Sequence, residues 1–195
     1  MEATGRSRVR PSEAGGPRRK RLGMTLAEVM VAVMVVTISV YLLSSAITAT
    51  AAHTAVKRER GIAVDAAWSA LETMRGEPFE HVFYRYNRAA VDDPDGPGTA
   101  PGAHFDVPGL MPRLDDPDGH VGEIVFSEAG PRLREDLADE DLGLPRDLNG
   151  DMRIDALDHA IDYIVLPLKV RVQWTGRAGA RDFEMYTMLG RTRGS

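Results

Sequence analysis

The chain of 195 residues carries 24 Lys or Arg against 29 Asp or Glu, a formal net charge of −5, and no cysteine. Disulfide and thiolate chemistry are therefore excluded, and the length allows one modest domain beside any targeting or membrane segment. Residues 1–23 hold seven of the basic and two of the acidic residues, which leaves 17 basic, 27 acidic and a net charge of −10 from residue 24 onward. An acidic chain argues against general affinity for nucleic acid, whose phosphates require clustered Lys and Arg.

The N-terminal part of the chain is predicted to be a targeting segment followed by a membrane helix. Residues 1–23 offer little apolar surface to bury, so we expect no folded structure there. From Val29 to Val56 there is no Asp, Glu, Lys or Arg, and about 20 apolar residues suffice to span a bilayer as a helix. Glu28 lies near one end of that helix, where a charged side chain needs a partner.

The junction between the two segments carries a specific resemblance. It reads Arg18-Arg19-Lys20-Arg21-Leu22-Gly23-Met24-Thr25-Leu26-Ala27-Glu28 and runs into the apolar segment. A basic leader, a Gly and a glutamate five positions later resemble the class III signal of type IV prepilins and of the pseudopilins of type II secretion. The resemblance implies cleavage by a prepilin peptidase after Gly23, N-methylation of Met24, and pairing of Glu28 with the amino terminus of a neighbouring subunit. Since an unpaired buried charge is costly, such a pairing would select assembly and register.

Two ordinary readings of the same segment compete with this one. It could be a plain signal anchor, or a secretory peptide cleaved near Ala49-Thr50-Ala51, which has the A-x-A pattern of a signal peptidase site. The apolar run is longer than the roughly 7–15 residues of a secretory peptide, and neither alternative requires Glu28.

The helix is predicted to continue beyond the membrane segment to about Gly76, where Pro78 disfavours helical geometry in the preceding residue. After Lys57, apolar residues recur at spacings compatible with one helix face. These residues are Ile62, Val64, Ala66, Ala67, Trp68, Ala70, Leu71 and Met74. We expect Trp68, Leu71 and Met74 to pack in the core of the domain that follows.

The rest of the chain is predicted to form a small antiparallel sheet. Phe79 to Tyr86 is expected to be a short strand or irregular turn, and 92–103 a loop. Strands are expected at Phe105–Leu110 and Val121–Ser127, and a hairpin at Ile164–Thr175 and Asp182–Leu189, closed by Gly176-Arg177-Ala178-Gly179. Pro167 is expected at an edge or at the start of regular pairing.

The predicted fold is therefore α+β, with a long N-terminal helix, transmembrane and then amphipathic, packed on a small antiparallel sheet. This order is similar to that of minor pilins and minor pseudopilins. The predicted divisions are a leader at 1–23, a membrane and assembly helix at 24–76 and a globular domain at 77–195.

A second motif runs from Asp147 to Asp158. Its oxygen-bearing side chains fall at loop positions 1, 3, 5, 9 and 12, which resembles the calcium loops of EF-hands and dockerins. The resemblance implies Ca²⁺ held by Asp147, Asn149, Asp151, Asp155 and Asp158, with the carbonyl of Arg153 at position 7 and a helix after Asp158 that contains Ala160, Ile161 and Ile164.

The loop departs from the resemblance at position 6, where Met152 stands in place of the usual Gly. A long side chain in a left-handed turn costs about 1 kcal/mol. The alternative for the whole motif is a solvated acidic loop in which Asp147 or Asp155 caps a helix.

Other polar motifs have simpler explanations. Asp92-Asp93-Pro94-Asp95-Gly96 recurs as Asp115-Asp116-Pro117-Asp118-Gly119, and such sequences favour tight turns, with an additional metal site as the alternative. The histidines, at 53, 81, 104, 120 and 159, lack zinc-type spacing, so each is expected to be structural or exposed. With no nucleophile elbow and no phosphate-binding glycine loop, we do not expect an enzyme.

These observations lead to one hypothesis and one alternative. The first is a minor pilin or pseudopilin of the inner membrane, with a cytoplasmic leader and a periplasmic domain, whose partners are a prepilin peptidase and other filament subunits. A retractable pilus, a secretion pseudopilus and a DNA-uptake fibre all stay open. The alternative is a plain single-pass membrane anchor that displays a calcium-dependent extracytoplasmic binding domain.

Overall fold

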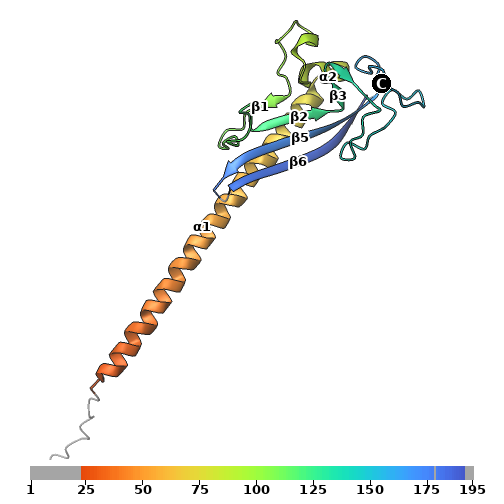
Figure 1. Cartoon of the computed structure of the whole chain (residues 1–195). Helices are drawn as coiled ribbons and strands as arrows, with labels where there is room; N and C mark the ends of the chain where they lie inside the picture. The colour runs from red at the N-terminus through yellow and green to blue at the C-terminus, as the bar shows by residue number, and fades with distance from the viewer. Residues whose placement is uncertain (1–22, 178, 192–195) are drawn as a thin grey trace, which may run out of the picture. The chain divides into compact units, whose positions relative to one another are not determined.

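The computed structural model describes residues 23–177 and 179–191, so the predicted disorder of residues 1–22 lies outside it. Figure 1 shows one long helix followed by a short helix and a sheet. The elements in chain order are α1 (Leu26–Gly76), α2 (Phe79–Tyr86), the 3-10 turn η1 (Ala90–Asp92), β1 (His104–Phe105), β2 (Gly122–Phe126), β3 (Glu128–Ala129), β4 (Arg132–Leu133), β5 (Val165–Gly176) and β6 (Gly179–Gly190).

The main sheet has the order β1-β2-β5-β6, with every neighbouring pair antiparallel, and β3 and β4 form a separate two-stranded hairpin. The predicted strand at Val121–Ser127 is confirmed as β2. The predicted terminal hairpin is confirmed as β5 and β6, which pair along their whole length up to Gly176 opposite Gly179. Pro167 stands one residue before Leu168, where pairing of β5 with β2 begins, so its missing N–H does not interrupt that ladder.

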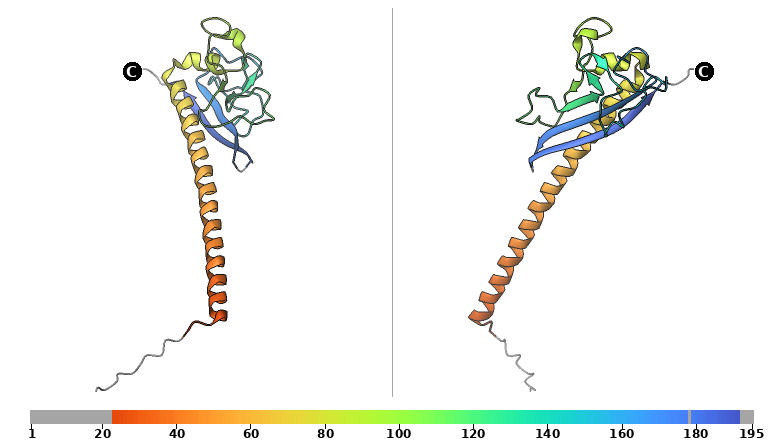
Figure 2. Two further views of the ribbon diagram at one scale, coloured as in Figure 1. Left: turned by 90° about the vertical axis from the view of Figure 1, so that its left-hand side faces the viewer. Right: turned by 45° about the vertical axis from the view of Figure 1, so that its right-hand side comes forward.

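The chain forms two compact units that divide between Ile47 and Thr48. Within the second unit, the later part of α1 lies along one face of the sheet (Figure 2). Its buried residues are Ala63, Ala67, Leu71 and Met74, each at most 1% exposed and spaced three or four apart. This spacing places them on one helix face, and the predicted α+β architecture is confirmed.

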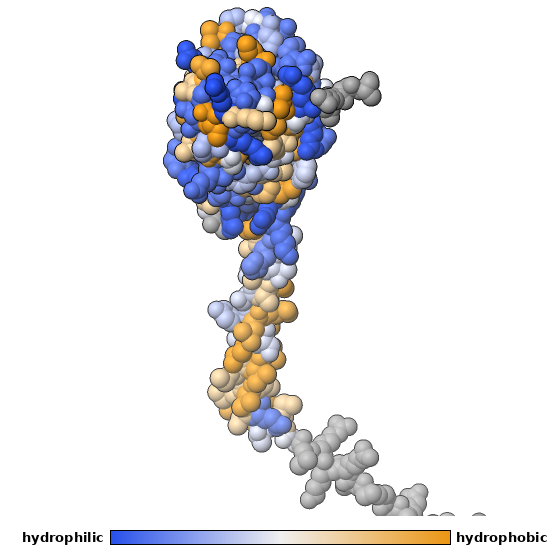
Figure 3. All heavy atoms as spheres, turned by 90° about the vertical axis from the view of Figure 1, so that its right-hand side faces the viewer, coloured by the Kyte–Doolittle hydropathy of each residue, from blue (hydrophilic) through white to orange (hydrophobic). Residues whose placement is uncertain are grey.

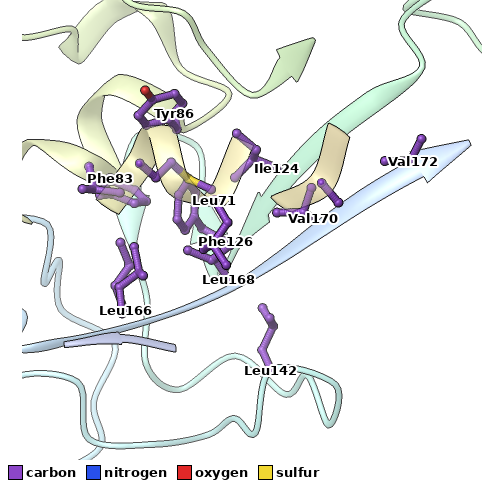
Figure 4. Close-up of a cluster of buried hydrophobic side chains, with 14 of the residues drawn as sticks. Leu71, Phe83, Tyr86, Ile124, Phe126, Leu142, Leu166, Leu168, Val170 and Val172 are labelled. Carbon is purple, nitrogen blue, oxygen red and sulfur yellow. The ribbon is translucent and has the colours of Figure 1, made fainter. Parts of the chain in front are cut away.

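The core lies between α1, α2 and the sheet (Figure 4). Phe83 of α2 meets Phe126 of β2 edge to face, with 5.5 Å between ring centroids, which is a favourable arrangement for aromatic pairs. Leu71 and Met74 are buried in this core as predicted. The prediction for Trp68 is wrong, because it is 49% exposed. Trp68 follows Ala67 directly, so it points about 100° away from the buried helix face.

The segment Phe79–Tyr86 is a helix, so its prediction as a strand or irregular turn is wrong. Pro78 precedes it, and Val82, Phe83 and Tyr86 bury one face of the helix. The hydroxyl of Tyr163 also donates to the carbonyl of Phe79 and accepts from the N–H of Phe83. Contacts that are distant in sequence therefore outweigh the β preference of an aromatic segment.

The strand predicted at Phe105–Leu110 stops at Phe105. Gly109 has a φ of 91°, and the N–H of Leu110 donates to the carbonyl of Val107 across a turn. Pro108 has no N–H to offer a sheet, so the backbone bonds locally instead.

Candidate functional sites

The first candidate site is the start of α1. Gly23 and Met24 are exposed and precede the helix, which begins at Leu26. The hydroxyl of Thr25 accepts from the N–H of Glu28 at 3.3 Å, which caps the helix. Glu28 lies in the first turn, where a negative charge is favoured by the helix dipole. Among the described residues, no side chain pairs with the Glu28 carboxylate.

The helix that follows Glu28 presents apolar side chains all round. In the described part of the chain, α1 is the one helix long and apolar enough to cross a membrane, which fits a single-pass membrane anchor. Figure 3 shows its first half as a predominantly hydrophobic surface. The exposed large apolar residues are Leu26, Val29, Met30, Val31, Val33, Met34, Val35, Val36, Ile38, Val40, Tyr41, Leu42, Leu43 and Ile47. The hydroxyls of Thr37 and Ser39 donate to helix carbonyls four residues earlier, both at 2.8 Å, so each is satisfied within the helix as an apolar solvent requires.

The second candidate site is the predicted calcium loop. The carboxylate of Asp147 accepts from the N–H of Gly150 at 2.6 Å and from that of Met152 at 2.8 Å. Burial alone would raise the pKa of Asp147, but these N–H donors outweigh it and lower the pKa below its usual range. Asn149 accepts from the N–H of Asp151, which in turn accepts from the N–H of Arg153. These side chains therefore shape the loop through its own backbone.

Met152 has a φ of 67° and is the one non-glycine residue with a positive φ in the described part of the chain. Position 6 of the loop thus takes the left-handed conformation that the resemblance to calcium loops implies. Calcium binding itself stays a prediction, because the same geometry also arises in an acidic loop closed by Asp147.

The prediction of a helix after Asp158 is wrong, since residues 160–162 form only a turn before β5. The carboxylate of Asp158 accepts from the N–H of Leu133 and from that of Ala160, both at 3.1 Å. The N–H of His159 donates to the carbonyl of Leu133 at 3.0 Å. The backbone completes one turn, in which the N–H of Tyr163 donates to the carbonyl of His159 at 3.2 Å, and the N–H of Ile164 then donates to the carbonyl of Leu148 at 2.8 Å instead of continuing a helix.

A third candidate site, a cluster of possible metal ligands, was not predicted from the sequence. Among residues 23–177 and 179–191, the potential ligand atoms of Glu135, Asp155 and His159 lie within 4.8 Å of one another. Glu135 is 0% exposed and His159 is 3% exposed. The cluster shares only Asp155 with the predicted calcium set. The sequence signal was weak: Asp155 and His159 are four residues apart, whereas Glu135 is brought in by the β3–β4 hairpin, which the pattern of the sequence did not reveal.

Hydrogen bonds orient this cluster. Glu135 accepts from the N–H of Leu148 and from that of Asp155, both at 2.9 Å. The Nδ1 atom of His159 lies 3.2 Å from Asp162. Burial alone would lower the pKa of His159, but the carboxylates of Glu135, Asp162 and Asp155 outweigh it and raise the pKa above its usual range.

The two Asp-Pro-Asp-Gly segments differ in the structure. The first closes a tight turn, in which the N–H of Gly96 donates to the carbonyl of Asp93 at 3.1 Å. In the second, Asp118 lies 3.0 Å from Nδ1 of His104, whose ring stacks on that of His120 with 5.8 Å between centroids. His104 is the first residue of β1 and His120 lies in the loop before β2, and both are partly exposed.

Comparison of the chain with protein families, with curated proteins and with solved structures gives no match. The functional argument therefore rests on the residues and their geometry.

Proposed function

We propose that this protein is a minor pilin or pseudopilin, a filament subunit stored in the inner membrane and processed after Gly23. The proposal rests on one observation: the segment from Gly23 to Glu28 leads directly into a helix whose two halves have different surfaces. Up to Ile47 the helix exposes apolar side chains, and from Ala63 to Met74 it buries one face against an antiparallel sheet. A plain anchor needs neither Glu28 nor a helix continuous with the domain core.

The proposed mechanism is mechanical. The first half of α1 holds the subunit in the bilayer, with the basic leader in the cytoplasm and the acidic domain in the periplasm, as the positive-inside rule favours. On assembly the apolar surface leaves lipid and packs among the helices of other subunits. Glu28 then pairs with the methylated amino terminus of a neighbour, which compensates the cost of removing both charges from water.

The first test is the intact mass and N-terminal sequence of the full chain, expressed with and without a prepilin peptidase. We expect a chain that begins at N-methylated Met24 only when the peptidase is present, and an unprocessed chain for Gly23→Leu. A chain that stays unprocessed, or that is cut near Ala51, contradicts the proposal and leaves an anchor or a secreted domain.

A second test separates assembly from folding. Glu28→Ala should abolish crosslinking of the processed subunit into filaments, because the amino terminus of the neighbour loses its partner. Glu72→Ala is the matched control on the same helix, since Glu72 lies at the surface and pairs with Arg75 at 2.8 Å; the two side chains are 63% and 44% exposed. Such a pair contributes at most about 1 kcal/mol. Equal filament yields from the two variants would remove the assembly role of Glu28.

The alternative function is a calcium-dependent binding domain on a plain membrane anchor. The left-handed conformation of Met152 favours it, because this is the backbone that position 6 of a calcium loop adopts. It predicts an intact leader together with a calcium-dependent ligand of the domain, so the peptidase experiment separates it from the filament proposal.

A further inference from the structure

We propose that Glu135, Asp155 and His159 form a binding site for one divalent transition-metal ion of the Zn²⁺ type, a role independent of filament assembly. The three side chains come from two segments. Glu135 follows β4, and Asp155 and His159 belong to the loop before β5. One imidazole and two carboxylates are a ligand set that suits Zn²⁺ and related ions, whereas Ca²⁺ takes oxygen ligands.

The distances fit a metal better than they fit hydrogen bonds. The Nε2 atom of His159 lies 3.3 Å from Glu135 Oε1 and 3.4 Å from Asp155 Oδ1. Hydrogen bonds between charged partners are shorter, about 2.7–2.9 Å. Zinc bonds of about 2.0–2.2 Å in a tetrahedron place neighbouring ligand atoms about 3.3–3.6 Å apart. Both separations from Nε2 match this range, and the three ligand atoms all lie within 4.8 Å of one another. A single Nε2 proton, in contrast, can form a well-aligned hydrogen bond with only one of the two carboxylates.

The charge of the cluster also favours a cation. His159 contacts the carboxylates of Glu135, Asp155 and Asp162, and a protonated imidazole balances only one of the three. Glu135 is 0% exposed, and a buried carboxylate without full compensation is costly. A divalent ion on a neutral imidazole would compensate both Glu135 and Asp155.

The surroundings supply what a metal site needs beyond its ligands. Asp162 lies 3.2 Å from Nδ1 of His159, on the side of the ring opposite the cluster. A carboxylate in that place fixes the tautomer of a metal-binding histidine and directs Nε2 toward the ion. The side chain of Asp162 is itself held by the amide of Asn149 at 3.0 Å. The side chain of Asp155 is 36% exposed, so an ion has a path from solvent and water can fill the fourth position.

The test uses the full chain in detergent micelles, freed of metal with a chelator and titrated with CoCl₂ alone as a spectroscopic probe. We expect the visible absorption of tetrahedral Co²⁺, saturating at one ion per chain and displaced by ZnCl₂. We also expect a rise of the thermal unfolding midpoint with ZnCl₂, since an ion that binds only the folded state stabilises it.

Asp155→Asn is the decisive variant. The side chain of Asp155 is partly exposed, so removal of its charge should not disrupt packing of the core. This variant should lower the Co²⁺ affinity at least tenfold, and Asp162→Asn should lower it by about 10- to 100-fold. Glu140→Gln is the control, because Glu140 is an exposed carboxylate outside the cluster, and it should leave the titration unchanged. Thermal unfolding of the metal-free variants reports that each is folded.

Three results would overturn the proposal. They are an absence of the tetrahedral Co²⁺ spectrum in the unaltered protein, an unchanged affinity in Asp155→Asn, and a midpoint that CaCl₂ raises as much as ZnCl₂ does. The last outcome would assign Asp155 to the oxygen-only calcium loop instead. None of the three bears on cleavage after Gly23.

Discussion

The two halves of α1 have the same backbone and opposite surfaces. Leu42, in the first half, is 61% exposed, whereas Leu71, in the second, is 1% exposed. The first half can be a helix on local grounds alone, because an unbroken apolar run satisfies its backbone internally in lipid. The second half is fixed by contacts with α2 and the sheet. One helix thus joins a segment whose structure follows from local sequence to a domain whose structure follows from distant contacts.

Among these tests of the two halves, truncation of α1 should have the largest effect on folding of the domain. A fragment 48–195 keeps Ala63, Ala67, Leu71 and Met74, so it should unfold cooperatively in a thermal melt. A fragment 77–195 loses these core residues, all at most 1% exposed, and should not fold, as near-ultraviolet circular dichroism would report. A cooperative melt for 77–195 would show that the domain does not depend on α1.

Two leucines on α1 provide the next test. Leu71→Ala should lower the free energy of unfolding of the domain by about 2–5 kcal/mol, because it leaves a cavity in the core. Leu42→Ala, the same change on the first half, should leave the unfolding midpoint of the domain unchanged in detergent. Denaturant titration of the full chain measures both, and similar losses for the two variants would remove the distinction between the halves.

Tyr163 tests a distant contact within the domain. It is 1% exposed, and burial raises its pKa to about 12 from a usual 10.0. The folded state therefore keeps the Tyr163 proton when the unfolded state has lost it. The resulting contribution to stability is present below about pH 10 and is lost as the pH rises toward 12, on the order of 2 kcal/mol in all.

The variant Tyr163→Phe isolates this effect. Its unfolding midpoint should be lower than that of the unaltered protein at pH 8, because the hydroxyl no longer bonds to Phe79 and Phe83, and the gap should narrow between pH 10 and 12. Tyr41→Phe is the control, since Tyr41 is 73% exposed on the first half of α1, outside the core of the domain. A gap that does not change with pH would mean that the Tyr163 proton is not linked to folding.

The same contrast between local sequence and distant contacts explains which elements could be predicted from the sequence. The long helix follows from its unbroken apolar run, and the β5–β6 hairpin follows from the alternation of Val170, Val172 and Trp174 together with the turn at Gly176. The helix α2 could not be predicted, since its eight residues are too few for a clear period and its buried face is completed by Tyr163, far along the chain.

The candidate sites divide in the same way. The Gly23–Glu28 junction and the loop from Asp147 are contiguous, so their residue spacing could be seen directly. The proposed transition-metal cluster could not be seen, because Glu135 joins Asp155 and His159 only after β4 has bonded to the loop. Burial of Glu135 at 0% exposure is a property of the folded chain, and the charge excess that favours a cation appears only there.

Substitution of Met152 should have the smallest effect on stability. It tests the loop where the backbone adopts a conformation that a residue with a Cβ does not prefer. Its φ of 67° is unfavourable for any residue with a Cβ, and its side chain is 94% exposed, so little packing is lost on removal. Met152→Gly should therefore raise the free energy of unfolding by up to about 1 kcal/mol, with the greater freedom of Gly in the unfolded chain offsetting part of the gain.

Met111→Gly is the matched control for this prediction. Met111 is 72% exposed but is not among the described residues with a positive φ, so the same change there only adds freedom to the unfolded chain and should destabilise by about 0.5–1 kcal/mol. Chemical denaturation with and without CaCl₂ completes the test. If the loop binds calcium, the relaxed turn of Met152→Gly should bind it at least as tightly as the unaltered loop. A variant destabilised as much as Met111→Gly would show that the left-handed turn carries no strain.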